Sequence, residues 1–543
     1  MSHTDVLIVG AGLAGMTTAI ELLDAGLRVV LLDRAPADTM GGLARWSMGG
    51  LFYVDSPFQR RAKITDNHSQ AFEDWCSAAE FGSEDHLPRQ WAEQYITHCI
   101  PDVYEWLKPK GIKYIPSVQW IERGHRRKGN SVPRFHVVWG AGRRLSETIK
   151  QQLIQHPARH HLTLKFRQEV GAIHLGENLH RLSGKDLDTG EPFEWEAPQI
   201  VLAAGGITGS VERVKQHWNP EVGPKPGYML SGSHLWADGQ IHDVAAKVGA
   251  KITHLENQWN YAAGVHHPDA EHPLHGLSLI PPKTALWVNA HGKRIGPLIT
   301  GFDTRHLVSE ICQQPKQYSW QILNYKTALK ELGVSGSLYN EAMTNRDVIG
   351  FIRNILFGNK PLVQTMLNRS KDFVTAESVK ELVQKMNDLT GTSDVNAEQL
   401  KRDIQAFDRA LEEGANSQDE QVQRIGKLRM YRGDKLRTTK YQRIMDPSAM
   451  PLIAIRAFVL TRKSMGGVQT DLNSRVLGED GNIIEGLYAV GENAGFGGGG
   501  IHGKRALEGT FLGNCIFTAR VAARHITGKA PIKSTPAVRT AIS

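Results

Sequence analysis

The sequence predicts an α/β protein in which a Rossmann-like domain for a dinucleotide is discontinuous along the chain and carries an inserted α+β cap, or substrate, domain. A strand, turn, helix and strand fill the first 33 residues, and glycine-rich stretches return near the C-terminus. Between them the chain becomes polar and charged, with apolar residues at helical spacing in 377–389 and 398–413. We therefore predict a first part of the Rossmann-like domain at 1–255 with a helical insertion at about 56–135, a cap at 256–450, a second part at 451–530, and a disordered tail at 531–543.

The first 33 residues have the layout of a dinucleotide-binding βαβ unit. An apolar strand, 6–9, runs into Gly10-Ala11-Gly12-Leu13-Ala14-Gly15, and a helix-like stretch leads to a second apolar strand that ends at Asp33. In such a unit the first glycine permits the tight turn, the second lets pyrophosphate approach the backbone, and the third lets the helix pack on the sheet. The helix N-terminus faces the phosphates, and the acid accepts hydrogen bonds from a ribose diol. The alternative is a glycine-rich turn in an unrelated α/β protein.

Size and composition exclude several classes of protein. The chain of 543 residues is long enough for two or three domains and an enclosed cofactor, and its 41% hydrophobic and 22% charged residues are typical of a soluble protein. No apolar run has the length of a membrane span, and the first strand begins too early for a secretory signal, so we expect no stable membrane insertion and a cytoplasmic location. The four cysteines, Cys76, Cys99, Cys312 and Cys515, lack the spacing of a disulfide framework or a metal site.

The formal net charge of +8 comes from basic and acidic residues that are mostly interleaved. One dense basic patch, 123–128, is interpreted as a solvated loop and not as a nucleic-acid contact. An anionic substrate or cofactor is a better explanation of local positive charge.

Further glycine clusters indicate that the dinucleotide carries a flat ring system. The cluster Gly41-Gly42-Leu43-Ala44 to Met48-Gly49-Gly50 follows soon after Asp33, and the chain returns to the cofactor at Ala204-Gly205. Two more clusters occupy 460–468 and 486–510. Backbone without side chains is needed where the edge of an isoalloxazine ring lies against the chain, whereas a nicotinamide makes no such demand.

Taken together and in this order, the four clusters resemble the flavoprotein subunit superfamily of fumarate reductase and succinate dehydrogenase. More narrowly, Ala494-Gly-Phe-Gly-Gly-Gly-Gly-Ile-His-Gly-Lys-Arg-Ala-Leu-Glu-Gly-Thr-Phe-Leu-Gly513, Asn130 to His136 and Leu460 to Gly467 look like a bacterial group of FAD-binding dehydrogenases described as 3-ketosteroid-Δ1-dehydrogenase-like. The resemblance implies that the Rossmann-like domain is an FAD-binding domain. Some relatives attach FAD through a histidine in this region, but no histidine lies between Asp33 and Gly50, so we expect noncovalent FAD.

The resemblance also implies positions for the cofactor. Asp33 would bind the adenosine ribose, Glu492 the ribityl hydroxyls and backbone near Val170 the adenine, while a helix that begins near Gly509 would point at the N1/O2 edge of the flavin. A helix N-terminus at that edge stabilises the anionic reduced flavin. The expected cofactor contacts are Gly10, Gly12, Leu13, Ala14, Gly15, Asp33, Arg34, Gly41, Gly42, Leu43, Ala44, Met48, Gly49, Gly50, Val170, Ala204, Gly205, Gly491, Glu492, Gly509, Thr510 and Leu512.

For the chemistry, the resemblance implies an FAD-dependent oxidoreductase that moves hydride between flavin N5 and a carbon–carbon bond next to a carbonyl or carboxylate, in either direction. Fumarate-reducing relatives bind carboxylate with a histidine and an arginine and move the proton with an arginine of the cap. In this sequence, Arg462 or Lys463 stands at the position of the histidine, and Arg505 stands at the position of the carboxylate-binding arginine. Arg305 is the counterpart of the arginine that moves the proton. His502 is a further acid/base candidate because its ordinary pKa is near neutrality.

Each of these assignments has an alternative. Arg305 would otherwise be a surface or ion-pair arginine, since an arginine relays protons only when enclosed beside partners, and His502 would be a structural residue of a turn. Steroid enzymes of this group use tyrosine hydroxyls, and Phe496 occupies one of those positions, so Tyr53, Tyr441 or another tyrosine of the cap would have to substitute.

We expect a small-molecule substrate that is either anionic or an enone, and we expect no metal. The sequence does not identify the electron partner, which could be a quinone, another flavoprotein or oxygen. Two rival functions stay open. A flavin monooxygenase would need an NAD(P)H site, for which there is no second GxGxxG motif, and an FAD-binding protein without catalysis would fit the shifted arginine and the missing tyrosine.

Overall fold

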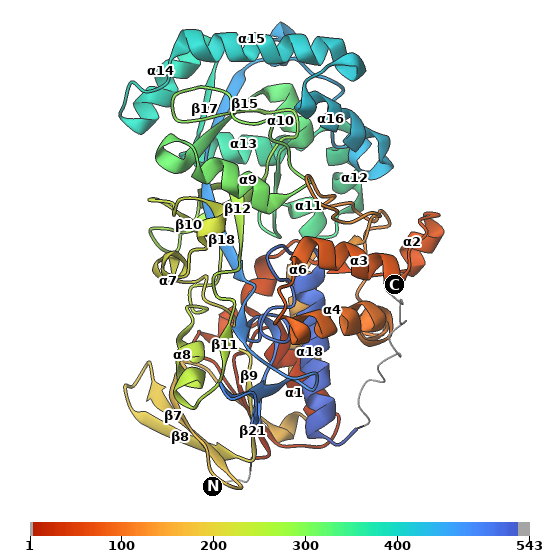
Figure 1. The fold of residues 1–543 in the computed structure, drawn as a ribbon, viewed down its shortest axis with the longest axis vertical. Helices are drawn as coiled ribbons and strands as arrows, with labels where there is room; N and C mark the ends of the chain where they lie inside the picture. Colours follow the sequence, from red (N-terminus) through yellow and green to blue (C-terminus); the bar gives the residue numbers. More distant parts are fainter. Residues whose placement is uncertain (1–3, 530–543) are drawn as a thin grey trace.

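The computed structural model describes residues 4–529, which form two lobes joined by long strands (Figure 1). The tail predicted at 531–543 lies outside the described residues. The first lobe is built on a six-stranded sheet with the order β20-β21-β9-β1-β2-β5. Its strands are β1 (Val6–Val9), β2 (Val29–Leu32), β5 (Leu162–Lys165), β9 (Gln199–Leu202), β20 (Arg475–Leu477) and β21 (Ile483–Ala489).

Chain segments far apart in the sequence complete this sheet. β1 lies between β2 and β9, and β21 from the C-terminal part of the chain pairs in parallel with β9, while β20 is antiparallel at the edge. β1 and β2 are buried along their whole length, as continuous apolar strands of a parallel sheet covered on both faces should be. The carboxyl ends of β1, β2 and β9 therefore face one common edge, where α/β proteins bind nucleotides.

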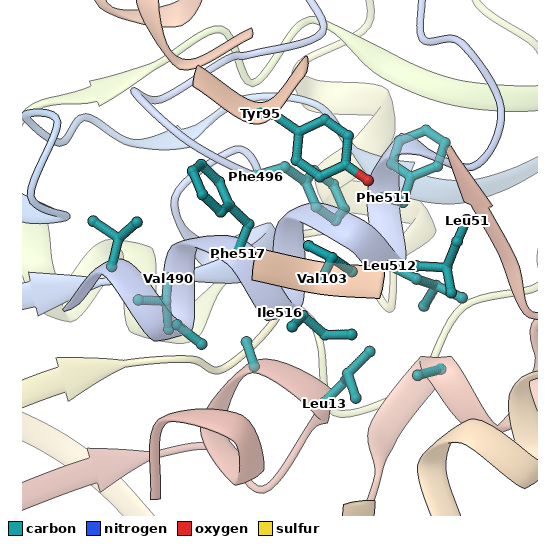
Figure 2. Close-up of a cluster of buried hydrophobic side chains, with 14 of the residues drawn as sticks. Leu13, Leu51, Tyr95, Val103, Val490, Phe496, Phe511, Leu512, Ile516 and Phe517 are labelled. Atoms are coloured by element: carbon teal, nitrogen blue, oxygen red, sulfur yellow. The ribbon is translucent and has the colours of Figure 1, made fainter. Parts of the chain in front are cut away.

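Helices α1 (Leu13–Leu23), α6 (Ala141–Ile154) and α18 (Thr510–Ile526) pack on one face of this sheet. The other face is covered by a three-stranded meander, β6 (Gln168–His174), β7 (His180–Asp186) and β8 (Pro192–Ala197), and by the short α8 (Gln240–Lys247). The short α7 (Val211–Gln216) packs in the core of the cap. Figure 2 shows Phe511, Ile516 and Phe517 of α18 packed among Leu13, Tyr95 and Val103.

The predicted helical insertion contains α2 (Pro57–Arg61), α3 (His68–Ala79), α4 (His86–His98), a π-helical turn at Cys99–Tyr104 and α5 (Glu105–Leu107), flanked by the strand pair β3 (Gly50–Phe52) and β4 (Phe135–Val137). It packs beside α18. This contact needs glycine at 513, because a Cβ there would lie 1.8 Å from the Tyr95 hydroxyl. The hydroxyl of Tyr95, which occupies this space, donates a 2.9 Å hydrogen bond to the Phe52 carbonyl.

The cap lobe is built on an eight-stranded sheet. Its main path is β14-β15-β18-β12-β13-β16, and β10 and β17 also pair with β18. The strands are β10 (Leu230–Ser231), β12 (Gln258–His266), β13 (Gly276–Ile280), β14 (Leu286–Val288), β15 (Tyr318–Asn324), β16 (Gly333–Val334), β17 (Phe373–Ala376) and β18 (Leu452–Ser464), while β11 (Ile252–Thr253) pairs with β19 (Gly467–Val468).

Nine helices of the described residues surround this sheet: α9 (Thr304–Cys312), α10 (Tyr325–Glu331), α11 (Glu341–Thr344), α12 (Val348–Phe357), α13 (Lys360–Arg369), α14 (Val379–Thr390), α15 (Ala397–Glu413), α16 (Glu420–Met430) and α17 (Arg432–Lys435). The segments 377–389 and 398–413, expected to be helical, are α14 and α15. Their buried stripes, such as Leu400, Ile404, Phe407 and Leu411, have the three- and four-residue spacing seen in the sequence.

The long strand β18 extends the cap beyond the domain boundary that was placed between residues 450 and 451. It pairs with β12, β15 and β17, so it belongs to the cap sheet and not to the second part of the Rossmann-like domain. Figure 1 shows it running from the cap toward the first lobe. Its composition, apolar and rich in β-branched residues, also suits a buried strand of either sheet, which is why the boundary could not be drawn from the sequence. No helix among residues 4–529 is long and apolar enough to span a bilayer.

Candidate active site

A cavity of about 880 Å³ is lined by residues of both lobes. The first lobe contributes the turn after β1, the end of β2, the 41–50 segment and the start of α18, and the cap contributes parts of β12, β13 and β18. A cavity between two domains with polar groups at a few points is the usual form of a cofactor and substrate site.

The glycines of the first turn have the separate roles that the motif predicts. A Cβ on Gly10 would lie 2.4 Å from the Ala203 carbonyl oxygen, and one on Gly15 would lie 1.9 Å from the Gly10 carbonyl oxygen, so both permit close packing. A Cβ on Gly12 would meet nothing within 4 Å, because this residue faces open space at the cavity. Gly12 caps α1 without a side-chain hydrogen bond, which leaves the first N–H groups of the helix available to an anion.

Asp33 closes the nucleotide end of the cavity. Its two carboxylate oxygens accept hydrogen bonds from the N–H groups of Ala11 (2.6 Å) and Ala35 (2.8 Å), and burial raises its pKa despite them. Asp33 lines the cavity and is held in place from behind, so its remaining lone pairs suit a ribose diol. The neighbouring Arg34 also lines the cavity and donates to Gln240 Oε1 at 2.8 Å.

The other end of the cofactor would meet the first turn of α18. Gly509 is its N-cap and supplies no side-chain hydrogen bond. Among residues 4–529, no acceptor binds the backbone N–H groups of Phe511 and Leu512, and both residues line the cavity. Unsatisfied N–H groups and the helix dipole form a place for negative charge, such as the N1/O2 edge of a reduced flavin.

Glu492 lies in the same wall. Its Oε1 accepts a 2.8 Å hydrogen bond from the Ser464 N–H, and burial raises its pKa to about 7. A carboxyl group that is oriented by a backbone hydrogen bond and is partly protonated near neutral pH is suited to bind hydroxyl groups. These features fit FAD: an uncapped helix N-terminus, a ribose-binding acid, a second acid for hydroxyls, and a second helix N-terminus.

Eighteen of the predicted cofactor residues line the cavity: Gly10, Gly12, Leu13, Ala14, Asp33, Arg34, Gly41, Gly42, Leu43, Ala44, Met48, Gly50, Val170, Ala204, Gly205, Glu492, Gly509 and Leu512. Gly15, Gly49, Gly491 and Thr510 do not. Gly15 and Gly49 permit backbone packing, since a Cβ on Gly49 would lie 2.6 Å from the Ala141 carbonyl carbon. A Cβ on Gly491 would lie 2.8 Å from the Ala14 Cβ. The Thr510 hydroxyl donates to the Leu507 carbonyl and is bound by His502.

A polar cluster at the junction of the lobes was not foreseen from the sequence. The hydroxyl of Tyr261 (β12) donates a 2.7 Å hydrogen bond to Glu508 Oε1 and accepts a 3.1 Å hydrogen bond from Lys463 Nζ (β18). Trp259 Nε1 donates to the same carboxylate oxygen at 2.9 Å. Tyr261, Lys463 and Glu508 line the cavity, and Lys463 Nζ lies 3.9 Å from the ring centroid of Phe511.

The charges of this cluster are mutually dependent. Desolvation lowers the pKa of Lys463 to about 8, against the attraction of Glu508. Burial acts to raise the pKa of Glu508, but Lys463 and the hydrogen bonds from Trp259 and Tyr261 outweigh it and hold the pKa below its ordinary value. Desolvation and the nearby Glu508 raise the pKa of Tyr261 well above its ordinary value. At neutral pH the cluster is thus an ammonium, a neutral phenol and a carboxylate.

Arg462, the other predicted cation on β18, also reaches the cavity. It is buried, donates to the Trp46 carbonyl at 3.3 Å, and has its pKa lowered by desolvation.

A second acid, Glu122, lines the cavity from the segment before β4 and was also missed. Its carboxylate accepts hydrogen bonds from the hydroxyl (2.5 Å) and the N–H (3.2 Å) of Thr304. Burial and repulsion from Asp303 raise its pKa well above the ordinary value.

The other predicted catalytic residues do not line the cavity. Arg505 forms ion pairs with Glu80 and, at 3.3 Å, with Asp303, so its guanidinium is held by these acids and not at the cavity. Arg305 donates to the Lys504 carbonyl (3.0 Å) and to Glu221 (3.3 Å), as an ion-pair arginine would.

His502 is fully buried, stacks on Trp75, and bonds the Thr510 hydroxyl at 2.8 Å. Burial keeps its pKa well below neutrality, so it remains uncharged.

A tyrosine of the cap lies at the cavity, but it is neither of the two that were named. Phe496 lines the cavity and packs edge-on against Phe511. Tyr53 is buried away from the cavity and bonded to the Tyr114 hydroxyl at 2.7 Å, and Tyr441 also does not line it. Tyr261 is the cap tyrosine whose hydroxyl lies in the polar cluster.

Among residues 4–529, no group of three or more His, Cys, Asp or Glu is arranged to hold a metal ion.

The charge of the predicted basic loop, 123–128, is partly neutralised, since Arg123 pairs with Asp434 and Arg127 pairs with Glu80 at 2.9 Å.

Comparisons with known proteins identify the family of the chain. Residues 5–512 match the family model described as FAD binding domain. A KsdD-like steroid dehydrogenase of Mycobacterium tuberculosis is 41% identical over 96% of this chain and 95% of its own length, and one of Mycolicibacterium smegmatis is 38% identical over 94% and 96%. A cytochrome-type fumarate reductase of Shewanella frigidimarina is 22% identical over 95% of this chain and 76% of its own.

Solved structures share the fold at low identity. The 3-ketosteroid Δ1-dehydrogenase of Sterolibacterium denitrificans has a TM-score of 0.67 at 16% identity, covering 97% of this chain and 100% of its own. A flavocytochrome c3 fumarate reductase in an open conformation has a TM-score of 0.67 at 20% identity, covering 97% and 78%.

The fold and the site define a flavoprotein oxidoreductase, a dehydrogenase or reductase of the class that acts on CH–CH groups. The chain belongs to the FAD-binding domain family, with KsdD-like steroid dehydrogenases among its relatives. Its cofactor is FAD, and the predicted fold class, cofactor and family are confirmed.

Proposed function

We propose that this protein oxidises or reduces the carbon–carbon bond next to the carbonyl of a steroid-like enone or ketone, with Tyr261 as the residue that handles the proton. The observation that carries the proposal is the position of the Tyr261 hydroxyl in the cavity wall, bonded to both Lys463 and Glu508. The names of the KsdD-like relatives support the substrate class.

The first lobe would hold FAD, which accepts or donates hydride when bound. In this proposal the N-terminus of α1 binds the pyrophosphate, Asp33 the ribose and Glu492 the ribityl hydroxyls. The first turn of α18 stabilises negative charge on the ring through the N–H groups of Phe511 and Leu512.

The polar cluster supplies the proton step in both directions. During reduction, Tyr261 Oη gives its proton to the substrate carbon, and Lys463 Nζ stabilises the phenolate that remains. Oxidation runs the same step in reverse. The phenol first passes its own proton to Glu508 Oε1 along the 2.7 Å hydrogen bond, and the resulting phenolate, stabilised by Lys463, takes the proton from carbon. Arg462 and Lys463 place positive charge where the substrate carbonyl becomes an enolate.

Aromatic and apolar side chains keep water from this reaction. Trp259 is buried beside Glu508, and Phe511 covers Lys463. A charge pair that is screened from water interacts more strongly and keeps its geometry.

The test is anaerobic stopped-flow of the FAD-loaded protein with a panel of 3-ketosteroids, enones and unsaturated acids, following the visible flavin band. Bleaching identifies a hydride donor, and recovery after prior reduction identifies an acceptor. Tyr261→Phe should slow the half-reaction by about a hundredfold to ten-thousandfold with FAD still bound, since proton transfer contributes about that much. Tyr441→Phe, which alters a tyrosine outside the cavity, is the matched control.

Flavin that no member of the panel reduces or reoxidises contradicts the proposal and favours an FAD-binding protein without catalysis. Rapid NADPH consumption coupled to hydroxylation would instead identify a monooxygenase. Candidate electron acceptors, a quinone, a second flavoprotein or oxygen, can be ranked by the rate at which each reoxidises the reduced protein. A cytoplasmic location is part of this proposal, and the four free cysteines support it.

A further inference from the structure

Two cations of the cap, Lys283 and Arg437, lie close together in the cavity wall, and neither forms an ion pair with a carboxylate of residues 4–529. We infer that they bind a carboxylate of the substrate, at a part of the cavity separate from Tyr261. The substrate would then be a steroid-like enone or ketone that also carries an acidic side chain. This inference rests on the proposed function and adds the substrate's second recognition group.

Lys283 is enclosed and almost unpartnered. Its side chain is 9% exposed, and its only hydrogen bond among residues 4–529 is a long one, 3.4 Å, to the Arg437 carbonyl. Two prolines, Pro281 and Pro282, precede it and restrict the backbone that presents it. Desolvation and repulsion from Arg437 lower its pKa, so the site stabilises this charge poorly without an added anion.

Arg437 faces the same space. Its side chain is exposed by surface area, yet desolvation lowers its pKa. A guanidinium that projects into the cavity satisfies both observations, because it borders the open space of the cavity and is still surrounded by protein. A Cβ on Gly333 would lie 3.4 Å from Arg437 Nη2, so the guanidinium lies against backbone that has no side chain. No hydrogen bond of this guanidinium exists among the described residues.

The nearest acids are already engaged elsewhere. Glu331 accepts hydrogen bonds from the N–H of Thr284 and from the N–H and hydroxyl of Thr439. Asp434 forms an ion pair with Arg123. Neither acid lies within 4.0 Å of Lys283 Nζ or of the Arg437 guanidinium, so the cations keep their donors for a ligand.

The pair is electrostatically distinct from the proposed proton site. The charges that act on Lys283 are Arg437, Glu331, Asp434 and Arg123, whereas those that act on Lys463 are Glu508, Arg462, Glu492 and Glu122. Apolar residues that include Leu279, Trp287, Leu307 and Leu428 also line the cavity. One cavity thus offers a proton-transfer cluster, an apolar surface and a separate anion-binding pair, which matches an apolar ring system with an acidic end.

The test compares an acid with its neutral ester. Calorimetry measures the binding of 3-oxochol-4-en-24-oic acid and its methyl ester to the oxidised, FAD-loaded protein, and stopped-flow measures flavin bleaching by each. We expect the acid to bind at least tenfold more tightly than the ester. Lys283→Met and Arg437→Met should each weaken acid binding about tenfold or more, the usual loss for a charged hydrogen bond, and leave ester binding unchanged. Lys401→Met, an exposed lysine of α15, is the control.

The outcomes separate this inference from the proposed function. An acid that binds no more tightly than its ester, or variants that weaken both ligands equally, overturn the carboxylate site even if the ester bleaches the flavin. An acid that binds through Lys283 and Arg437 but never reacts with the flavin supports the site and contradicts the proposed reaction. Unchanged FAD content and ester affinity show that the variants fold.

Discussion

The charge of Lys463 should control the reaction and give it a characteristic pH dependence. Lys463 Nζ lies 3.1 Å from the Tyr261 hydroxyl, which becomes a phenolate when it gives up its proton. At an effective dielectric constant of about 20, two unit charges at this distance attract by about 5 kcal/mol. Part of that attraction offsets the cost of desolvating the ammonium. The loss of one such donor in known enzymes corresponds to about 3–4 kcal/mol, or a rate loss of about a hundredfold to a thousandfold.

We therefore expect Lys463→Met to slow the flavin half-reaction in the reducing direction by about that factor, with FAD still bound. The pKa of Lys463 is about 8, lowered by desolvation, so the ammonium is present below that pH and is lost as the pH rises through it. The wild-type rate should fall above pH 8 with a single ionisation. Lys463→Arg keeps the charge, because an arginine is deprotonated only above about pH 12, and should remove that fall.

Stopped-flow over a pH series, with one substrate and constant ionic strength, measures these rates. A wild-type rate that stays level well above pH 8, or a Lys463→Met variant as fast as wild type, would refute the role of this charge. A fall above pH 8 that persists unchanged in Lys463→Arg would assign the ionisation to another group.

Two further predictions concern positions that the sequence singled out. Gly12→Ala should fold normally but bind FAD more weakly, because its methyl group enters open space at the cavity. Gly15→Ala should instead lower the unfolding temperature, because its Cβ would lie 1.9 Å from the Gly10 carbonyl oxygen. FAD titration and thermal unfolding separate the two variants, and equal FAD affinity in Gly12→Ala and wild type would be inconsistent with this account. Arg505→Ala should leave the rate of the flavin half-reaction within a few-fold of the wild-type rate, because Arg505 pairs with Glu80 and Asp303 and does not line the cavity. A hundredfold lower rate in stopped-flow would show that Arg505 binds substrate after all.

The cofactor half of the site could be predicted because its requirements are local. Turn glycines, an acid at the end of a strand and a glycine before a helix are set by backbone geometry within a few residues, so the sequence pattern carries them. Gly12, Asp33 and Gly509 illustrate this: each lies at the cavity in the structure. Four predicted cofactor positions do not line the cavity: Gly15, Gly49, Gly491 and Thr510. The motif itself assigns Gly15 to packing, but nothing in the sequence separates Gly49 and Gly491, which are also glycines for packing, from glycines that face a ligand.

The substrate half depends on contacts between distant segments, and there the sequence was less informative. Tyr261 and Glu508 are 247 positions apart and meet only because the cap folds back on the first lobe. Trp259 and Tyr261 are two positions apart on β12 and so lie on one face of that strand, but this spacing is common in strands that have no catalytic role, and no strand was predicted here. Arg505 was placed by its distance from a motif, and such a distance does not show that the side chain pairs with Glu80.

The sheet of the cap explains why Tyr261 and Lys463 can form a precise pair. They lie on neighbouring antiparallel strands, where Trp259 is paired with Lys463 and Tyr261 with Leu460, so backbone hydrogen bonds fix their separation. Glu508 belongs to the other lobe, immediately before α18, whose first turn faces the cofactor site. The hydrogen bond from Tyr261 to Glu508 therefore joins the two lobes. Any opening of the cap would break it, so the route for the proton would be complete only while the cap covers the cavity and excludes water.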